Sequence, residues 1–201
     1  KSPSGYRLVM RDRTMLAFTA AVLVYYFVYL QSDSTLPLAV RHSGLAPHVY
    51  GLCMALNGVV ICVAQPILTP RLIRHDPGRV WAAGVALVGV GFALTAIAST
   101  TGGYLFSVAV WSFGEIFPAT VTGAIVARLA PEDLRGRYSG LYSLAVASGW
   151  LTSSLGGTQL LSVSPLALWG SCALLSAASA YGVLRLAPRL RPVKPERSEL
   201  L

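Results

Sequence analysis

The sequence predicts an all-α membrane protein with six transmembrane helices in two three-helix repeats, and three observations support this. Of the 201 residues, 54% are hydrophobic and 12% charged, with a mean hydropathy of +0.61, whereas soluble domains carry roughly twice that share of charge. Six apolar stretches approach or exceed the about 20 helical residues that cross a hydrocarbon core. Basic residues fall in every second connection between these stretches.

The transmembrane bundle is expected at residues 14–187, between a cytoplasmic linker at 1–13 and a cytoplasmic tail at 188–201. Its six spans are expected at about 14–38, 49–69, 80–98, 104–127, 138–161 and 165–187. The charged connections at 71–79 and 128–137 contain Pro and Gly, which favour turns. Barrel strands would show alternation over about ten residues, and this is absent.

The placement of charge predicts the orientation of the spans. Fifteen of the sixteen Lys and Arg residues fall on one side of the six-span topology, and Arg41 falls on the other. The positive-inside rule therefore places both termini in the cytoplasm. We expect a multi-pass protein of the plasma (cytoplasmic) membrane, with the lipid bilayer as its surroundings. The same placement accounts for the net charge of +8, and no nucleic-acid motif accompanies it, so no nucleic-acid partner is expected.

Polar residues are unevenly shared among the spans. Spans one, two, four and five carry Tyr, Asn, Gln, Glu and Ser side chains, whereas spans three and six are nearly apolar. Unpartnered polar groups in hydrocarbon cost several kcal/mol, so we expect spans three and six to face lipid. The pattern polar, polar, apolar then repeats, as in the three-helix repeats of transporters. Glycines are expected at close helix contacts, including Gly84, Gly89 and Gly91, and the pair Gly136 and Gly140.

Enzyme and metal chemistry find no support in the sequence. The three cysteines lie in apolar stretches without CxxC spacing, and His42, His48 and His75 lack ligand spacing. There is no nucleophile elbow, HExxH, P-loop or GxGxxG motif. We therefore expect no catalytic residue, no metal and no cofactor.

The apolar run from Gly102 to Ala127 contains one acidic residue, Glu115, and no Lys, Arg or His. Glu115 lies about halfway along its span, too deep to reach either surface. An intramembrane acid indicates a functional site by default, because burying its charge is costly. Two interpretations stay open: a neutral carboxyl bonded within a helix interface to Asn57 or a serine, or a cavity group that exchanges a proton or meets a cationic substrate.

Other polar side chains carry the same two kinds of interpretation. Tyr25, Tyr26 and Tyr29 form either an aromatic wall for flat lipophilic cations or part of an interfacial or lipid-facing surface. Gln65 forms either a substrate contact or an interhelical hydrogen bond.

Two further features lie on the spans or at their ends. Pro118 removes a helical hydrogen bond from the Gly114 carbonyl, which kinks span four or is tolerated in it. Asp33, Arg41 and His42 are expected in a solvated outer loop.

Three segments resemble the major facilitator superfamily, in particular the C-terminal six-helix half of a bacterial multidrug-efflux member. The most specific is "FGEIFPATVTGAIVARLAPEDLRGRYSGLY" (113–142), which looks like span ten and the following loop of that branch. "LPLAVRHSGLAPHVYGLCMALNG" (36–58) is similar to the outer loop and span eight. In "RLIRHDPGR" (71–79), Gly78 and Arg79 match the end of the family's Gly-x-x-x-Asp-Arg-x-Gly-Arg loop.

The resemblance implies half of a secondary active transporter that exports small lipophilic or cationic compounds in exchange for protons by alternating access. Its partners would be an N-terminal six-helix half, a small-molecule substrate and protons. Glu115, Asn57, Gln65 and the three tyrosines would serve proton coupling or the substrate cavity, and the cytoplasmic gating loops would contain Arg79, Asp133 and Arg135. The alternatives are an uptake carrier of the same superfamily for another solute, and a non-transporting membrane anchor or assembly subunit.

Overall fold

The computed structural model describes residues 5–190, and every regular element in that range is helical. The elements are α1 (Gly5–Val9), α2 (Arg13–Tyr29), α3 (Gln31–Ser34), α4 (Leu36–His42), α5 (His48–Leu72), α6 (Pro77–Thr95), α7 (Thr101–Leu129), the 3-10 turn η1 (Glu132–Leu134), α8 (Arg135–Val163) and α9 (Pro165–Leu190). Residues 1–4 of the predicted linker and residues 191–201 of the predicted tail lie outside the described residues.

Side-chain caps explain where several of these helices begin. The Asp12 carboxylate accepts hydrogen bonds from the backbone N–H groups of Thr14 and Met15 at 2.9 and 3.0 Å, at the start of α2. Such caps satisfy N–H groups that have no partner within the helix. The other carboxylate oxygen of Asp12 accepts a hydrogen bond from the Tyr138 hydroxyl at 2.9 Å. One aspartate therefore both starts α2 and ties it to the start of α8.

The first predicted span is a helical path with two breaks. α2 ends at Tyr29, and the short helices α3 and α4 carry the chain on to His42. The residues expected in a solvated outer loop, Asp33, Arg41 and His42, are exposed, but the loop itself was wrong, because Asp33 lies within α3 and Arg41 lies in the last turn of α4. Ser and Thr side chains in this stretch bond to carbonyls three or four residues earlier, which keeps the polar segment helical.

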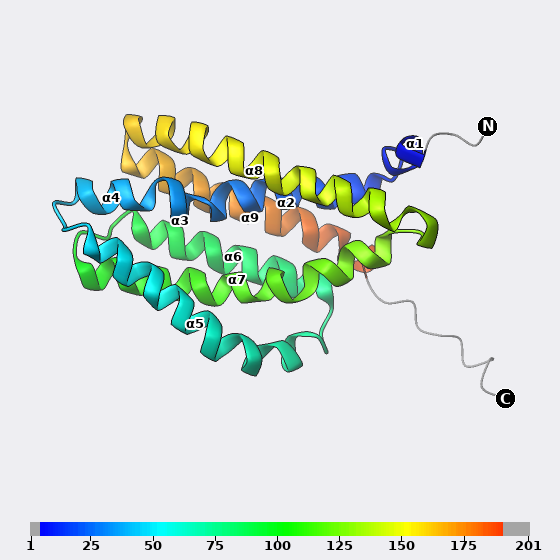
Figure 1. Cartoon of the computed structure of the whole chain (residues 1–201), viewed down its shortest axis with the longest axis horizontal. Helices are drawn as coiled ribbons and strands as arrows, with labels where there is room; N and C mark the ends of the chain where they lie inside the picture. Colours follow the sequence, from blue (N-terminus) through cyan, green and yellow to red (C-terminus); the bar gives the residue numbers. More distant parts are fainter. Residues whose placement is uncertain (1–4, 191–201) are drawn as a thin grey trace.

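The long helices form an elongated bundle in which α5 lies along one edge, beside α7 (Figure 1). Within the described residues, five helical stretches are long and apolar enough to cross a membrane. They are Arg13–Ser34, His48–Leu72, Pro77–Thr95, Thr101–Leu129 and Pro165–Leu190. α8 has 29 residues, as many as α7, but its run of Ser, Thr, Gly and Gln lowers its hydropathy below that of the other five. That α8 is a sixth span stays a prediction.

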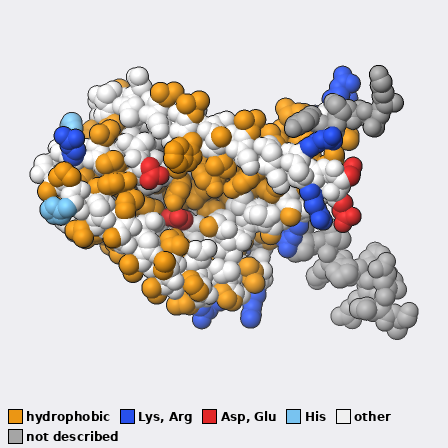
Figure 2. Space-filling view, viewed as in Figure 1, with side chains coloured by type: hydrophobic (Ala, Val, Ile, Leu, Met, Phe, Trp, Pro, Cys, Tyr) orange, Lys and Arg blue, Asp and Glu red, His pale blue; other side chains and the backbone are white. Residues whose placement is uncertain are grey.

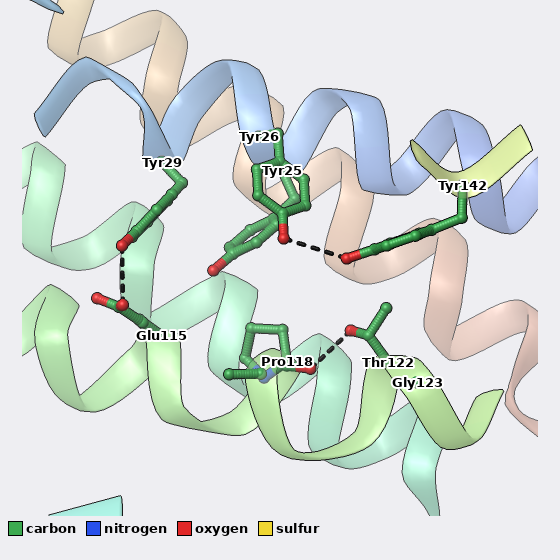
Figure 3. Close-up of a pocket in the computed structure, with 9 residues that line it drawn as sticks. Tyr25, Tyr26, Tyr29, Glu115, Pro118, Thr122, Gly123 and Tyr142 are labelled. Carbon is green, nitrogen blue, oxygen red and sulfur yellow. Dashed lines mark hydrogen bonds between the residues drawn. The ribbon is translucent and has the colours of Figure 1, made fainter. Parts of the chain in front are cut away.

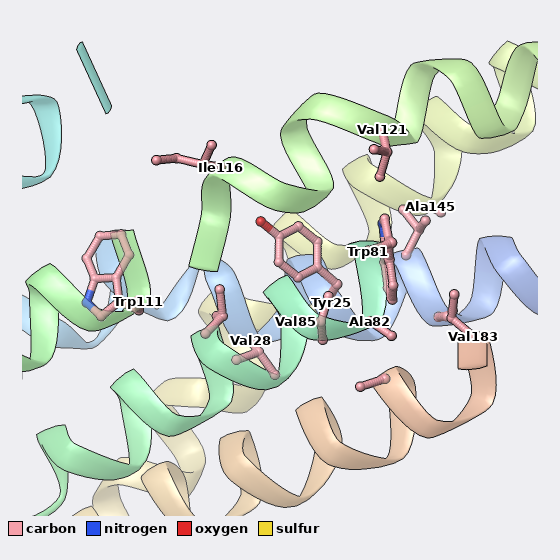
Figure 4. Packing of buried hydrophobic residues seen from close by; sticks show 14 of the residues in the cluster. Tyr25, Val28, Trp81, Ala82, Val85, Trp111, Ile116, Val121, Ala145 and Val183 are labelled. Carbon is pink, nitrogen blue, oxygen red and sulfur yellow. The ribbon is translucent and has the colours of Figure 1, made fainter. Parts of the chain in front are cut away.

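Aromatic side chains fill the middle of the bundle. The ring of Phe92 on α6 stacks on Trp111 of α7 and on Trp169 of α9, with centroid distances of 5.7 and 5.6 Å. Tyr25 of α2 meets Trp81 of α6 edge to face at 5.8 Å, and both point into the packed interior (Figure 4). Burial of these large rings supplies much of the packing between the helices.

Glycine allows α6 and α7 to approach closely. A Cβ atom added at Gly84 would lie 2.5 Å from Pro118 Cδ and 2.6 Å from the Gly114 carbonyl oxygen. One at Gly91 would lie 2.5 Å from Trp111 Cβ. The expected close packing of α6 glycines is therefore confirmed. The same expectation was wrong for Gly136 and Gly140, where an added Cβ would meet no atom within 4 Å among the described residues.

Spans three and six, which correspond to α6 and α9, were expected to face lipid. Each of these helices can face lipid on one side at most, because its other side packs in the bundle. α6 is the most buried of the five apolar stretches and packs between α7 and α9. α5, a polar span in the sequence, is the least buried. Small residues let the apolar α6 enter the core, because backbones can approach closely there.

Charged side chains gather at the ends of the bundle. Figure 2 shows Lys and Arg mainly toward the end at which α2 begins and α9 ends, with one basic group beside His at the opposite end. Acidic side chains appear also in the middle of the face shown, far from these cations. The arrangement agrees with the charge pattern from which the cytoplasmic side was predicted, and the orientation itself stays a prediction.

Candidate functional site

Glu115 lies on α7, where two neighbouring helices supply hydrogen-bond donors to its carboxylate. The Tyr29 hydroxyl, at the end of α2, donates to Oε1 at 2.8 Å. The Asn57 amide, on α5, donates to Oε2 at 3.0 Å and to the Ser112 hydroxyl at the same distance. The bond from Asn57 that one of the two interpretations of Glu115 requires is thus present, and the choice between them stays open. Each carboxylate oxygen has a neutral donor, so the charge is solvated by the protein without being neutralised.

A cavity of about 270 Å³ opens beside this carboxylate. Figure 3 shows the rings of Tyr25, Tyr26 and Tyr29 on one side of it and Glu115 on the other. The remaining lining residues are Pro118, Ala119, Thr122, Gly123 and Tyr142. This lining contains no Lys, Arg or His, so any positive charge in the cavity would have to come from a proton or a bound molecule.

The three predicted tyrosines form one aromatic cluster. The rings of Tyr25 and Tyr29 are stacked with centroids 5.7 Å apart, and the Tyr26 ring meets each of them edge to face. Residues four apart lie on the same side of a helix, which explains the stacking of Tyr25 on Tyr29. The cluster faces the cavity, and Tyr25 is also buried against the core.

Gln65 lies apart from this group. It is on α5 about two turns beyond Asn57, it is half-buried, and it does not line the cavity. The structure therefore brings together five of the six residues predicted for proton coupling or the substrate cavity.

Tyr142 was missed by the sequence reasoning. Its hydroxyl is 3.2 Å from that of Tyr26, and this hydrogen bond joins α8 to α2 across the cavity (Figure 3). The sequence around Tyr142 gives little indication of a site, because this tyrosine lies among small and apolar residues near the start of a span. Pro118 could be weighed from the sequence as a kink, but its place in the cavity wall depends on how α7 packs.

A second cavity, of about 300 Å³, adjoins the first. Gly123 and Tyr142 line both cavities, and the second is also lined by Arg135 and Ser139 at the start of α8. The side chain of Arg135 lies 3.6 Å from the carboxylate of Glu132. Tyr142 and Gly123 therefore lie at the boundary between the Glu115 cavity and a space lined by Arg135 at the charged end of the bundle.

The other predicted gating residues lie at turns. Arg79 is exposed in the first turn of α6, where its backbone N–H donates to the Asp76 carboxylate at 3.1 Å. Asp133 is exposed in η1. These positions lie at helix ends, outside the Glu115 cavity.

Comparison with known proteins identifies the family. The Major Facilitator Superfamily model matches residues 14–200. A Na(+), Li(+), K(+)/H(+) antiporter of Planococcus maritimus is 21% identical over 159 residues, which cover 72% of this chain and 38% of the relative. The chain thus spans about two fifths of the length of this curated relative. Because the match to the family takes in nearly all of the sequence and the described fold is entirely helical, the chain belongs to the major facilitator superfamily.

Proposed function

We propose that this chain is the C-terminal six-helix half of a secondary active transporter that exports small lipophilic or cationic compounds in exchange for protons. The observation that carries the proposal is the Glu115 carboxylate, midway along α7, facing a tyrosine-walled cavity without a fixed cation. The family consists of transporters, and the relative is a cation/proton antiporter. Both support exchange of a proton for another solute.

The chemistry of the exchange follows from the two hydrogen bonds to Glu115. Both donors, Tyr29 and Asn57, are neutral, so a proton or a cationic group can each neutralise the carboxylate. Occupation by one disfavours the other, because the single negative charge cannot be compensated twice. Release of one proton then accompanies binding of one positive charge, which is the coupling that an antiporter needs.

The tyrosine rings would select the cargo. A cation over an aromatic face within about 6 Å is attracted by the ring's negative face, and desolvation strengthens the attraction. The cavity volume of about 270 Å³ falls just below the 300–1,000 Å³ typical of ligand pockets. The facing half of the transporter would complete the pocket, in a site near the midplane between two bundles.

The exposed faces of α5 and α8 support a second bundle as partner. Large apolar side chains on these helices are exposed, among them Val59, Val63, Leu151 and Leu155. Asn57 on α5 and Ser148 on α8 lie on the same helices, half-buried. A surface that mixes apolar and polar groups suits contact with protein and water better than with lipid alone. The loops with Arg79, Asp133 and Arg135 would then gate the cytoplasmic side of the cavity.

Reconstitution of the complete transporter tests this function. Proteoliposomes with a pH-sensitive dye inside would be given tetraphenylphosphonium, a hexose or a dipeptide, one at a time. We expect tetraphenylphosphonium alone to move protons opposite to its own movement. Uptake of the hexose or the dipeptide without that response would favour the uptake carrier. No transport of any solute, together with an intact cellular function, would favour the membrane anchor.

A further inference from the structure

We propose that Asp33 and Trp150 form a second cation-binding site, between α3 and α8, that takes a small organic ammonium group. A cavity of about 170 Å³ is lined by both residues and by Leu30, Ser34, Ser153 and Ser154. None of these six residues lines the Glu115 cavity. Each water molecule takes about 30 Å³ in the liquid, so the cavity has room for several waters or for one small ammonium group.

The walls of this site are held in place by Gln31. Its side chain is fully buried and donates to the carbonyl oxygens of Phe27 and Ser153, at 3.0 and 3.3 Å. Its amide oxygen accepts from the hydroxyls of Ser34 and Thr35. A buried amide with these partners fixes α3 against α8.

Gly157 on α8 makes room for that amide. A Cβ atom added there would collide with the Gln31 side chain. The site therefore rests on a built junction between the two helices.

Asp33 brings a negative charge to the junction with no cation nearby to neutralise it. Its carboxylate forms no hydrogen bond or ion pair among residues 5–190, and no Lys, Arg or His lines the cavity. The residue is exposed on the described chain and is the last but one of the stretch Arg13–Ser34, which is long and apolar enough to cross a membrane. A carboxylate within such a stretch is costly unless a cation or water meets it.

Trp150 adds a surface that favours an organic cation over a metal ion. Its side chain is 59% exposed, whereas Trp81, Trp111 and Trp169 are at most 1% exposed. An indole face attracts ammonium groups, quaternary ones included, and offers a metal ion no oxygen. Metal ions of the hard type take several oxygen ligands. In the described part of the chain, no group of three His, Cys, Asp or Glu side chains could hold one.

The site would give an exported cation a second stop after Glu115, because Asp33 lies beyond Tyr29 toward the side predicted to face outward. Asp33 lies four residues beyond Tyr29, whose hydroxyl donates to Glu115. In this respect the inference deepens the proposed function and rests on it. Binding at Asp33 can nevertheless be measured without transport, so either claim can fail while the other stands.

Equilibrium binding to the complete protein in detergent tests the site. Tetramethylammonium chloride would be titrated while tryptophan fluorescence is followed, since Trp150 is the exposed tryptophan of the described chain. NaCl and KCl would be titrated separately. Asp33→Asn removes the charge and keeps the size. Trp150→Leu, measured by calorimetry, removes the ring. Glu132→Gln is the matched control, because it removes an exposed carboxylate far along the chain from the cavity.

We expect saturable binding of tetramethylammonium that weakens at least tenfold in Asp33→Asn and in Trp150→Leu and changes less than twofold in Glu132→Gln. The same titrations in Glu115→Gln, which lacks the charge of the other cavity, should show the same dependence on Asp33 and Trp150, so loss of proton coupling in that variant would leave this site standing. Absence of saturable binding to the wild type, unchanged affinity in folded Asp33→Asn, or equal affinity for Na⁺ or K⁺ would each overturn the proposal. Gel filtration shows which variants are folded. If Asp33→Asn does not fold, the affinity of Trp150→Leu for tetramethylammonium decides the outcome.

Discussion

Among single residues, Tyr29 has the closest relation to Glu115, because its hydroxyl donates a 2.8 Å hydrogen bond to the carboxylate. Tyr26 lines the same cavity but bonds Tyr142 instead. The two tyrosines are three residues apart on one helix, and each loses only a hydroxyl on mutation to Phe. They form a matched pair for asking what the carboxylate contact contributes.

Tyr29→Phe should reduce proton-coupled transport at least tenfold, with a much smaller loss in Tyr26→Phe. A hydrogen bond to a charged group is worth about 1.5–3 kcal/mol, and about 1.4 kcal/mol corresponds to tenfold. Initial rates in proteoliposomes, normalised to the amount of folded protein, would measure both. Equal rates for Tyr29→Phe and the wild type would show that this hydrogen bond does not serve transport.

Several site residues could be predicted from the sequence because their chemistry conflicts with a membrane interior. Glu115 stood out as an acid among apolar residues, and Asn57 as an amide in a span. Tyr142 and the junction at Gln31 could not be found in this way. Their roles depend on contacts between α2 or α3 and α8, separated by more than a hundred residues, and no local pattern encodes such a contact.

Among the elements, the crossing of α6 and α7 positions the cavity, because Gly114 and Pro118 flank Glu115 on α7. An added Cβ at Gly84 of α6 would meet both of them. Backbone atoms cannot rotate away as side chains do, so α7 would have to move. The site thus depends on a residue that contributes no atom to its lining.

Gly84→Ala should destabilise the protein by about 1–3 kcal/mol through overpacking. Gly182→Ala on α9 is the control, since its Cβ would meet no described atom within 4 Å. The control should be neutral or stabilise by up to about 1 kcal/mol through helix propensity. Unfolding in detergent, followed by tryptophan fluorescence, compares the two. Equal stability of both variants would contradict the close approach of α6 and α7.

α8 shows where prediction from composition reaches its limit. The charge pattern predicts six spans, whereas five described stretches are long and apolar enough to cross a membrane. Ser and Thr hydroxyls that lower the hydropathy of α8 also donate hydrogen bonds to its own carbonyls, as those of Thr152 and Thr158 do. Hydroxyls partnered in this way cost less in hydrocarbon than their hydropathy indicates.

Cysteine labelling on intact cells should show that α8 crosses the membrane. With Cys62 replaced by Ser, Asp133→Cys should react only from the cytoplasm and Ser162→Cys only from outside. Cys53 and Cys172 are buried and should stay unlabelled. Labelling of both introduced cysteines from one side would place α8 on the membrane surface and reduce the topology to five spans.

For the whole molecule, the proposed mechanism needs two bundles. Alternating access moves one bundle against another around a central site, and this chain spans about two fifths of its curated relative. We therefore expect purified residues 1–201 alone to show no transport in liposomes. Restoration of transport by co-reconstitution with the other half would support this account, and robust transport by the monomeric chain alone would refute it.

The central claim is that Glu115 carries the coupling proton, and transport driven by a pH gradient tests it most directly. The complete transporter would be compared with Glu115→Gln and Glu115→Asp in proteoliposomes across a range of pH. Gln keeps the size and hydrogen-bonding capacity of the side chain but cannot titrate. We predict that Glu115→Gln folds normally and loses proton-driven transport or its pH dependence, and that Glu115→Asp keeps part of the activity. A folded Glu115→Gln protein with unchanged pH dependence would contradict the claim.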